Sequence, residues 1–157
     1  MTQLPVPHAA TAPSRPRRLL LAVTESDSHA VGNKLLERHL TQQGYEVLNL
    51  GVCTPVEEIA AAARDFCPEA IILSSQNGHA FDDLARLPEA LHSVDVPAVP
   101  IYLGGNLSVG TTKDLDSLKH QFLTLGVQVV EALEHLELRL LAPAPCMEEN
   151  TDATPTR

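Results

Sequence analysis

Polar residues able to bind or react gather first in the segment ESDSHAVGNK, residues 25–34, between an apolar run and a helix-like segment. Its histidine, His29, could act as a ligand, although a lone loop histidine is more often simply solvated. Asp27, two residues earlier, could instead accept hydrogen bonds from the following helix and cap it. Taken alone, this segment leaves ligand binding and helix capping open.

Two further polar loops follow later in the chain, SSQNG (74–78) and GGNLSVG (104–110). The hydroxyl groups of Ser74 and Ser75 could satisfy backbone groups where a strand ends. Gly104 and Gly105 could form a plain turn. Each loop by itself therefore has an interpretation that needs no ligand.

The elements that position these loops are predicted from apolar runs. Runs that barely alternate in polarity are typical of buried parallel strands, and four are found, at 18–24, 45–51, 69–75 and 99–105. Each of the three polar loops begins at the carboxyl end of one of these runs. The intervening segments have the 3.6-residue period of helices.

The predicted helices are defined by their apolar stripes. Thr54 is expected to cap the second helix, with Pro55 at its first position and Glu57 completing a capping box. Pro88 is expected to kink or shorten the third. The stripes are Val31, Leu35, Leu36 and Leu40, ending before a capping Gly44; Val56, Ile59, Ala60, Ala63 and Phe66; Phe81, Leu84, Leu87 and Leu91; Leu115, Leu118 and Phe122; and a final helix at about 129–141.

Four or five strands alternating with helices predict an α/β fold, an open, doubly wound parallel sheet of the flavodoxin-like (Rossmann-like) kind. Ligands of such sheets bind beyond the carboxyl ends of the strands, near the switch in strand order. The three polar loops should therefore share one edge of the sheet. That shared position favours a binding site over three unrelated turns.

Three other uses of such loops are disfavoured by the residues present. GGNLSVGTT resembles a phosphate-binding loop, but Thr111 occupies the position of the phosphate-binding lysine and Lys113 comes two residues late. Aromatic residues that would stack on a flavin are missing. The acidic cluster that follows the first strand of a phosphoacceptor receiver domain is missing as well.

Length and composition predict one domain, residues 17–141, between proline-containing disordered tails at 1–16 and 142–157. The formal net charge of −9 opposes nucleic-acid binding. The three cysteines, Cys53, Cys67 and Cys146, lack CxxC spacing, which argues against a disulfide framework or a structural zinc site. No apolar run approaches the roughly 18 residues of a membrane span, so a soluble, cytoplasmic protein is expected.

Taken together, Asp27-x-His29-x-x-Gly32, Ser74-x-Gln76 and Gly104-Gly105 resemble the signature of cobalamin-binding domains, D-x-H-x-x-G, S-x-L and G-G. The resemblance runs from about residue 19 to 126. It is nearest to the small subunit of glutamate mutase (methylaspartate mutase), because SDSHAVGNK and GGNLSVG are similar to that subunit's versions of the motifs.

The resemblance implies a role for each motif. In this family a histidine is the lower axial ligand of cobalt, which would be His29, with Asp27 accepting a hydrogen bond from its other ring nitrogen. Ser74 would reach the displaced benzimidazole, and Gly104 and Gly105 would leave a channel for the nucleotide tail. The expected cofactor contacts are Ser26, Asp27, Ser28, His29, Ala30, Gly32, Ser74, Ser75, Gln76, Gly104, Gly105, Asn106, Leu107, Ser108, Val109 and Gly110.

The sequence departs from the family pattern at two places. Gln76 stands where the family has leucine, and its amide could bond the cofactor instead. After LGV (125–127) the chain continues almost directly into VVEALEHLELRLL, whereas the family usually has a fifth strand and a loop with proline and glycine before its last helix. A fifth strand is therefore not evident from the sequence.

The function implied is that of the cobalamin-binding subunit of an adenosylcobalamin-dependent glutamate mutase, which converts L-glutamate to (2S,3S)-3-methylaspartate. A separate large (β/α)8-barrel subunit would carry the substrate site, and this chain should be inactive alone. Alternatives are a cobalamin carrier or sensor without mutase activity, a corrinoid methyl-transfer protein, and a related mutase with another substrate.

Overall fold

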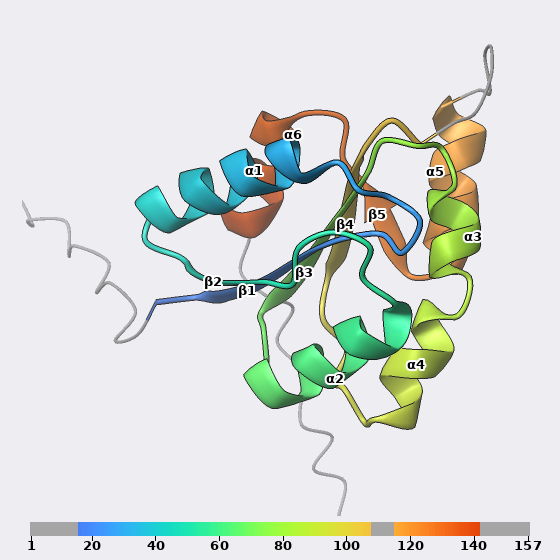
Figure 1. The fold of residues 1–157 in the computed structure, drawn as a ribbon, viewed down its shortest axis with the longest axis horizontal. Coiled ribbons are helices and arrows are strands. Elements are labelled where there is room, and N and C mark those ends of the chain that lie inside the picture. Colours follow the sequence, from blue (N-terminus) through green and yellow to red (C-terminus); the bar gives the residue numbers. More distant parts are fainter. Residues whose placement is uncertain (1–15, 108–114, 142–157) are drawn as a thin grey trace, which may run out of the picture.

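The computed structural model describes residues 16–107 and 115–141 (Figure 1). The tails predicted at 1–16 and 142–157 lie outside the described residues except for Pro16. So do Ser108, Val109 and Gly110 of the third polar loop.

Five parallel strands form one sheet in the order β2-β1-β3-β4-β5. Their bounds are Arg18–Val23 (β1), Glu46–Asn49 (β2), Ala70–Ser75 (β3), Ile101–Gly105 (β4) and Val127–Val129 (β5). The four predicted strands are confirmed to within two residues at each end. The fifth strand, which was not evident from the sequence, is present and pairs with β4 from Ile101↔Val127 onward.

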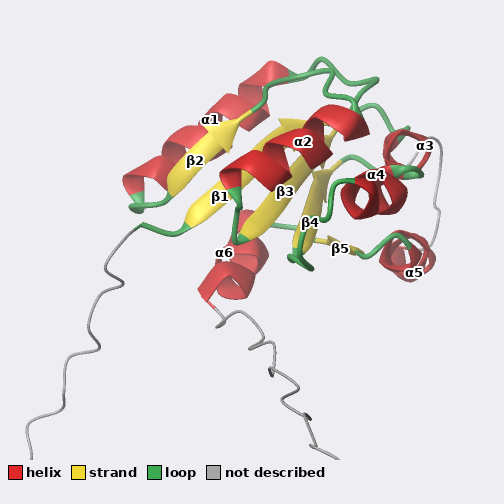
Figure 2. Cartoon of the chain, turned by 90° about the horizontal axis from the view of Figure 1, so that it is seen from below, coloured by secondary structure: helices red, strands yellow, loops and turns green. Residues whose placement is uncertain are grey.

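Helices cover both faces of the sheet, as predicted for a doubly wound fold (Figures 1 and 2). The first cluster of buried side chains packs α1 (Ala30–Gln42) and α6 (Leu133–Leu141) on one face. The second packs α2 (Val56–Phe66), α3 (Ala80–Leu84), α4 (Leu87–Ser93) and α5 (Leu115–Thr124) on the other. Strand order reverses between β1 and β3, which makes the carboxyl ends of these two strands the switch point at which such folds bind ligands.

Alternate residues of the central strands enter the two clusters. Leu19 and Leu21 of β1 face α1 and α6, whereas Leu20 and Ala22 face the other layer. Because both faces are covered, every position of β1 after Arg18 is buried, and this explains why the run barely alternates in polarity.

The apolar stripe predicted for α1 is only partly buried. Leu40 is buried and Leu36 is half-buried, but Val31 and Leu35 are 74% and 63% exposed. Both lie in the first half of the helix, and Val31 lines an open cavity. The predicted end of this helix is confirmed, since it finishes at Gln42 and Gly44 follows with a φ of +91°.

The capping box predicted for α2 is wrong. The helix begins at Val56, with Pro55 as the N-cap, and no side chain caps it. The hydroxyl of Thr54 donates to the carbonyl of Gly51 instead, at 3.3 Å. Glu57, expected to complete the box, pairs with Arg86 at 2.6 Å.

Two other predicted helices have different bounds. The third is two helices, α3 and α4, and Pro88 lies in the first turn of α4, where its missing N–H breaks no helical bond. The last helix begins at Leu133 rather than near 129, because β5 takes residues 127–129. The α5 helix is confirmed, with Leu118 and Phe122 buried, and the side chain of Leu115 lies outside the described ones.

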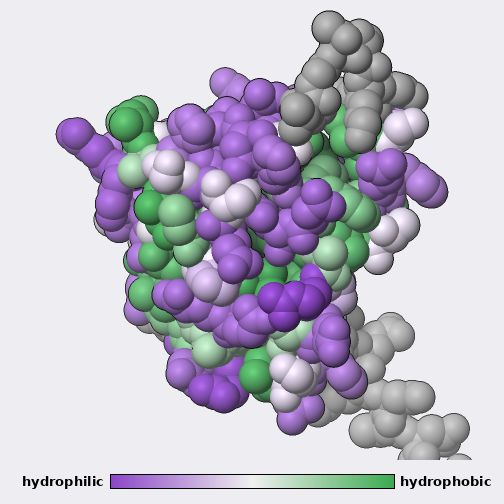
Figure 3. All heavy atoms as spheres, turned by 45° about the vertical axis from the view of Figure 1, so that its right-hand side comes forward, coloured by the Kyte–Doolittle hydropathy of each residue, from purple (hydrophilic) through white to green (hydrophobic). Residues whose placement is uncertain are grey.

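Three general properties of the described residues bear on function: surface hydropathy, free cysteines and helix length. On the face drawn in Figure 3, hydrophilic side chains predominate and hydrophobic ones are scattered among them. Cys53 and Cys67 are free thiols. Within residues 16–107 and 115–141, the helices are all too short or too polar to cross a bilayer.

Candidate functional site

The three polar loops meet at one edge of the sheet, as predicted. Val23 at the end of β1 is in register with Ser74 of β3, and Ser74 is in register with Gly104 of β4. The backbones from which the loops begin are therefore direct neighbours.

A buried carboxylate holds the histidine of the first loop. The side chain of Asp27 has no exposed surface, while that of His29 is 63% exposed. Asp27 Oδ1 lies 2.5 Å from His29 Nδ1 and accepts a hydrogen bond of 2.9 Å from the His29 backbone N–H. Its Oδ2 accepts a hydrogen bond from the backbone N–H of Gln76. Both carboxylate oxygens are thus engaged by the loops after β1 and β3.

The surroundings of Asp27 decide its protonation state. Burial raises the pKa of this carboxyl, but the hydrogen bonds from Gln76 and His29 together outweigh burial and hold the pKa below its ordinary value of 3.8. Asp27 is therefore an anion at neutral pH. It is an acceptor only, so His29 Nδ1 must be the donor in this contact.

The orientation of His29 leaves one ring nitrogen available. With the proton on Nδ1, the lone pair of a neutral imidazole is on Nε2. Nε2 has no hydrogen-bond partner among residues 16–107 and 115–141. The helix-capping interpretation of Asp27 fails, because α1 begins after His29 without any side-chain cap. The pair has instead the geometry of a supported nitrogen ligand.

The pair lies beside a cavity of about 660 Å³ between α1, α6 and the sheet. This volume falls within the range of small-molecule and cofactor sites. The predicted residues that line it are Asp27, Ser28, His29, Ala30, Gly32, Ser74, Gln76, Gly104 and Gly105.

Other predicted residues lie outside the lining. The two serines of β3 separate because successive side chains of a strand point to opposite faces. Ser74 is half-buried on the cavity face, whereas Ser75 is fully buried and bonds Asn77. Ser26 bonds Asp83, and Leu107 belongs to the core on the far side of the sheet. Asn106 is exposed and does not line the cavity either.

The two glycines of β4 occupy their positions for different structural reasons. Gly105 has a φ of +118°, and a Cβ built there would lie 2.0 Å from the carbonyl oxygen of Ser75. Only glycine therefore fits at this position. A Cβ on Gly104 would be in ordinary contact with the carbonyl oxygen of Val130, at 3.5 Å. Gly104 forms part of the cavity wall where β4 and the segment after β5 approach each other.

Sequence reasoning missed most of the apolar wall. The missed lining residues are Val23, Val31, Asn33, Leu36, Ile72, Leu73, Val130, Glu131, Ala132, Leu133 and Leu136. Alternation along β1 and β3 could have assigned Val23 and Ile72 to the face of Ser74. The contribution of residues 130–136 depends on how α6 packs, for which the sequence has no comparable signal.

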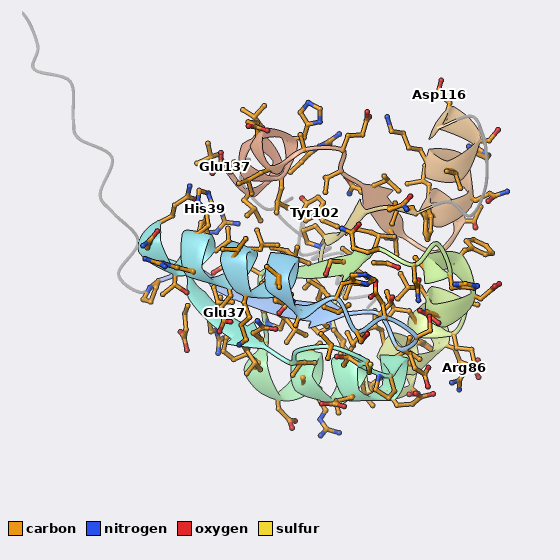
Figure 4. The ribbon with its side chains drawn as sticks, turned by 45° about the horizontal axis from the view of Figure 1, so that its top comes forward. Glu37, His39, Arg86, Tyr102, Asp116 and Glu137 are labelled. Atoms are coloured by element: carbon orange, nitrogen blue, oxygen red, sulfur yellow. The ribbon has the colours of Figure 1, made fainter. Side chains whose placement is uncertain are left out.

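A polar contact ties the two helices that form the walls. His39 of α1 lies 2.6 Å from Glu137 of α6, measured between Nε2 and Oε1, and Gln43 donates to the same oxygen (Figure 4). Leu40 of α1 and Leu136 of α6 are buried in the same cluster. The cavity therefore lies between helices that contact each other further along α1.

Comparison with known proteins agrees with this geometry. The family model described as the B12 binding domain matches residues 17–133. The chain belongs to the B12-binding family. Within it, the glutamate mutase sigma subunit 1 of Haloarcula marismortui is 39% identical over 111 residues, which are 71% of this chain and 72% of that protein. The glutamate mutase sigma subunit of Treponema denticola is 36% identical over 113 residues, 72% of this chain and 81% of that protein.

Solved structures of B12-binding proteins share the fold. A cobalamin-binding protein from Desulfitobacterium hafniense matches with a TM-score of 0.63 at 19% identity, over 82% of this chain and 60% of that one. The family match supports cobalamin as the cofactor of this chain. The resemblance predicted from the three motifs is confirmed.

Proposed function

We propose that this chain is the cobalamin-binding small subunit of an adenosylcobalamin-dependent glutamate mutase, which interconverts L-glutamate and (2S,3S)-3-methylaspartate. The relatives named glutamate mutase sigma subunits support the reaction class. The observation that carries the proposal is the supported histidine at the cavity, with Nδ1 held by a buried carboxylate and Nε2 available.

The donor set fits a cobalt ion. His29 would hold the cobalt through Nε2, since imidazole nitrogen suits first-row transition metals. Asp27 would fix the tautomer and raise the basicity of the ring. Because Asp27 is itself held by the Gln76 backbone, the direction in which Nε2 points is set by two loops at once.

The cavity fits the nucleotide tail of cobalamin. Its walls are mainly apolar, with Leu36 on α1, Ile72 on β3 and Leu136 on α6, and such walls suit a benzimidazole ring. The hydroxyl of Ser74 would supply the hydrogen-bond donor that the displaced benzimidazole nitrogen needs. Gly104 would leave room where a side chain would otherwise narrow the channel.

The work is divided between two chains in this proposal. The bound cofactor supplies the radical chemistry of the rearrangement. This chain ligates and orients the cofactor through the loop after β1, and a large barrel subunit binds the substrate. No residue of this chain needs to touch the substrate, so the chain alone should be inactive.

Reconstitution tests the proposal. The purified chain is mixed with adenosylcobalamin, L-glutamate and the large subunit of a glutamate mutase, and 3-methylaspartate is measured by chromatography. The proposal predicts product only when both subunits are present. Cobalamin binding without any rearrangement of glutamate would contradict the mutase assignment, and methyl transfer from methylcobalamin would favour a corrinoid shuttle.

A further inference from the structure

Asn33 is a polar exception on the face of α1 that packs toward the sheet. Asn33, Leu36 and Leu40 are spaced so that they share one face of the helix, and the two leucines pack in the cluster between α1, α6 and the sheet. Asn33 is only 3% exposed and lines the cavity. Because buried side-chain amides are normally hydrogen-bonded, both polar atoms of Asn33 need partners.

The oxygen of the Asn33 amide is held by the end of β2. Asn33 Oδ1 accepts from Asn49 Nδ2 at 2.6 Å, and the same nitrogen donates to Oε2 of Glu37, labelled in Figure 4, at 2.8 Å. Asn49 Oδ1 accepts a hydrogen bond of 2.9 Å from the Gly51 backbone N–H. The Asn49 amide therefore cannot be reversed, and the atom of Asn33 that faces it must be the oxygen.

The nitrogen of the Asn33 amide has no partner among residues 16–107 and 115–141. It is not sealed from solvent either, because Thr24 Oγ1 is the only side-chain nitrogen or oxygen in those residues that is both fully buried and without a partner. Asn33 is almost completely buried and lines the cavity, so the open side of Nδ2 is the cavity side. Asn33 thus presents an unsatisfied N–H donor to a ligand in the cavity.

The place of Asn33 on α1 indicates which part of the cofactor it would meet. Asn33 comes four residues after His29, which is about 6 Å along a helix axis. With the cobalt held by His29, a donor at this depth lies below the corrin ring, beside the nucleotide tail. The ribose and phosphate of that tail carry oxygen acceptors, whereas the apolar walls suit its base.

We propose that Asn33 is a cofactor-binding residue that donates a hydrogen bond from Nδ2 to a ribose or phosphate oxygen of the nucleotide tail. The inference rests on the proposed function and adds a contact that the D-x-H-x-x-G signature does not contain. Asn49 orients the Asn33 amide, so that its donor rather than its oxygen faces the tail.

Asn33→Asp changes only the group that faces the cavity. The aspartate keeps the shape of the side chain and an oxygen for Asn49, but it replaces the N–H donor by a carboxylate oxygen. A carboxylate near the N-terminus of a helix is favourable, so this variant should fold. Asn33→Ala, which removes the whole amide, is the second variant. Gln121→Glu, on the exposed side of α5, adds the same charge away from the cavity and is the matched control.

Spectroscopic titration with cobalamin measures the contact. Loss of one hydrogen bond in Asn33→Ala should raise the Kd by about 3- to 10-fold. Asn33→Asp should raise the Kd further, by roughly tenfold or more, because two acceptors then face each other. The spectrum at saturation should stay that of the wild type, since His29 is intact. A wild-type Kd in both Asn33 variants would overturn the proposal.

Cobinamide, which has the corrin ring but lacks the phosphate, ribose and base, locates the acceptor. A contact with the tail predicts that the cobinamide Kd is the same in the wild type and in Asn33→Ala. Equal losses of cobalamin and cobinamide affinity would place the acceptor on the ring and overturn the assignment to the tail.

The side-chain N–H groups of Asn33 give a reading on the wild-type chain itself. Their NMR signals can be assigned by their absence from Asn33→Asp. Exchange of these protons with water should slow when cobalamin binds and should stay fast when cobinamide binds. Equally fast exchange with both corrinoids would contradict the hydrogen bond.

The two proposals fail in different ways. A wild-type chain that binds no cobalamin would refute the proposed function and this contact with it. Tight cobalamin binding by the wild type and equally by both Asn33 variants would refute the contact alone and leave the proposed function standing.

Discussion

Replacing Asp27 by asparagine tests the support of the histidine most sharply. The carboxylate accepts from His29 on one oxygen and from Gln76 on the other. An asparagine of the same shape has one acceptor oxygen and one NH2 group. One of the two sets of donors must then face another donor, in a site where the side chain is fully buried.

The magnitude follows from this geometry. A buried donor left without an acceptor costs about 1–3 kcal/mol, so the free energy of unfolding of Asp27→Asn should fall by about that amount. Loss of the partner that orients a metal-ligating histidine typically weakens metal affinity by roughly 10- to 100-fold. Cobalamin affinity should fall in that range as well.

Two assays separate these effects. Chemical denaturation of the chain without cofactor gives the change in stability, and spectroscopic titration with cobalamin gives the change in Kd. Asp82→Asn, on the exposed side of α3, controls for loss of a negative charge and should leave both unchanged. Wild-type stability together with wild-type affinity in Asp27→Asn would refute the assignment of Asp27.

Three further substitutions probe the walls and the core. Gly32→Ala should stabilise the chain without cofactor by up to about 1 kcal/mol, since a Cβ meets nothing within 4 Å, but should weaken cobalamin binding in a titration, because Gly32 lines the cavity. Thr24→Val should raise the free energy of unfolding in urea by about 1 kcal/mol, since this buried hydroxyl lacks a partner among the described residues; a loss of stability would contradict that. A hydrogen bond from His39 holds the pKa of Glu137 below 4.5. The Glu137 carboxylate therefore contributes to the free energy of unfolding above pH 4.5, and this contribution is lost as the pH falls through the lowered pKa. Glu137→Gln should therefore destabilise the chain at neutral pH but not in acid, unlike the exposed control Glu134→Gln.

The sheet could be predicted from sequence because its signals are local. Each central strand is a short apolar run buried on both faces, and the polar loops mark where the runs end. The position of β5 was harder to predict, because Val127–Val129 is only three residues long and its apolar residues also suit the start of a helix. Its pairing with β4, a tertiary contact, makes this segment a strand rather than the start of a helix.

Helix starts were predicted less well because several local solutions compete. Thr54 has the right type and spacing for a cap, yet a bridge between Thr24 and Thr54 holds it at the sheet edge, where its hydroxyl bonds the Gly51 carbonyl. The apolar stripe of α1 predicted burial of Val31 and Leu35, but both are exposed, and Val31 lines the cavity. An apolar residue that faces a ligand site has the same sequence signal as one that faces the core.

The candidate site was predicted to the extent that motifs define it. The Asp27 and His29 contact follows from a spacing of two residues in one loop. The roles of Ser26 and Ser75 did not follow, because they depend on Asn77 in the loop after β3 and on Asp83 in α3, which the signature does not include. The contribution of α6 to the cavity depends on long-range packing.

The visible absorption spectrum of the purified chain with cobalamin, beside that of His29→Ala, tests whether His29 ligates the cobalt. His92→Ala, an exposed histidine on α4, is the matched control. We expect a histidine-ligated spectrum with displaced benzimidazole in the wild type and the control, and the loss of that spectrum in His29→Ala. The same histidine-ligated spectrum in all three proteins would show that His29 is not the cobalt ligand.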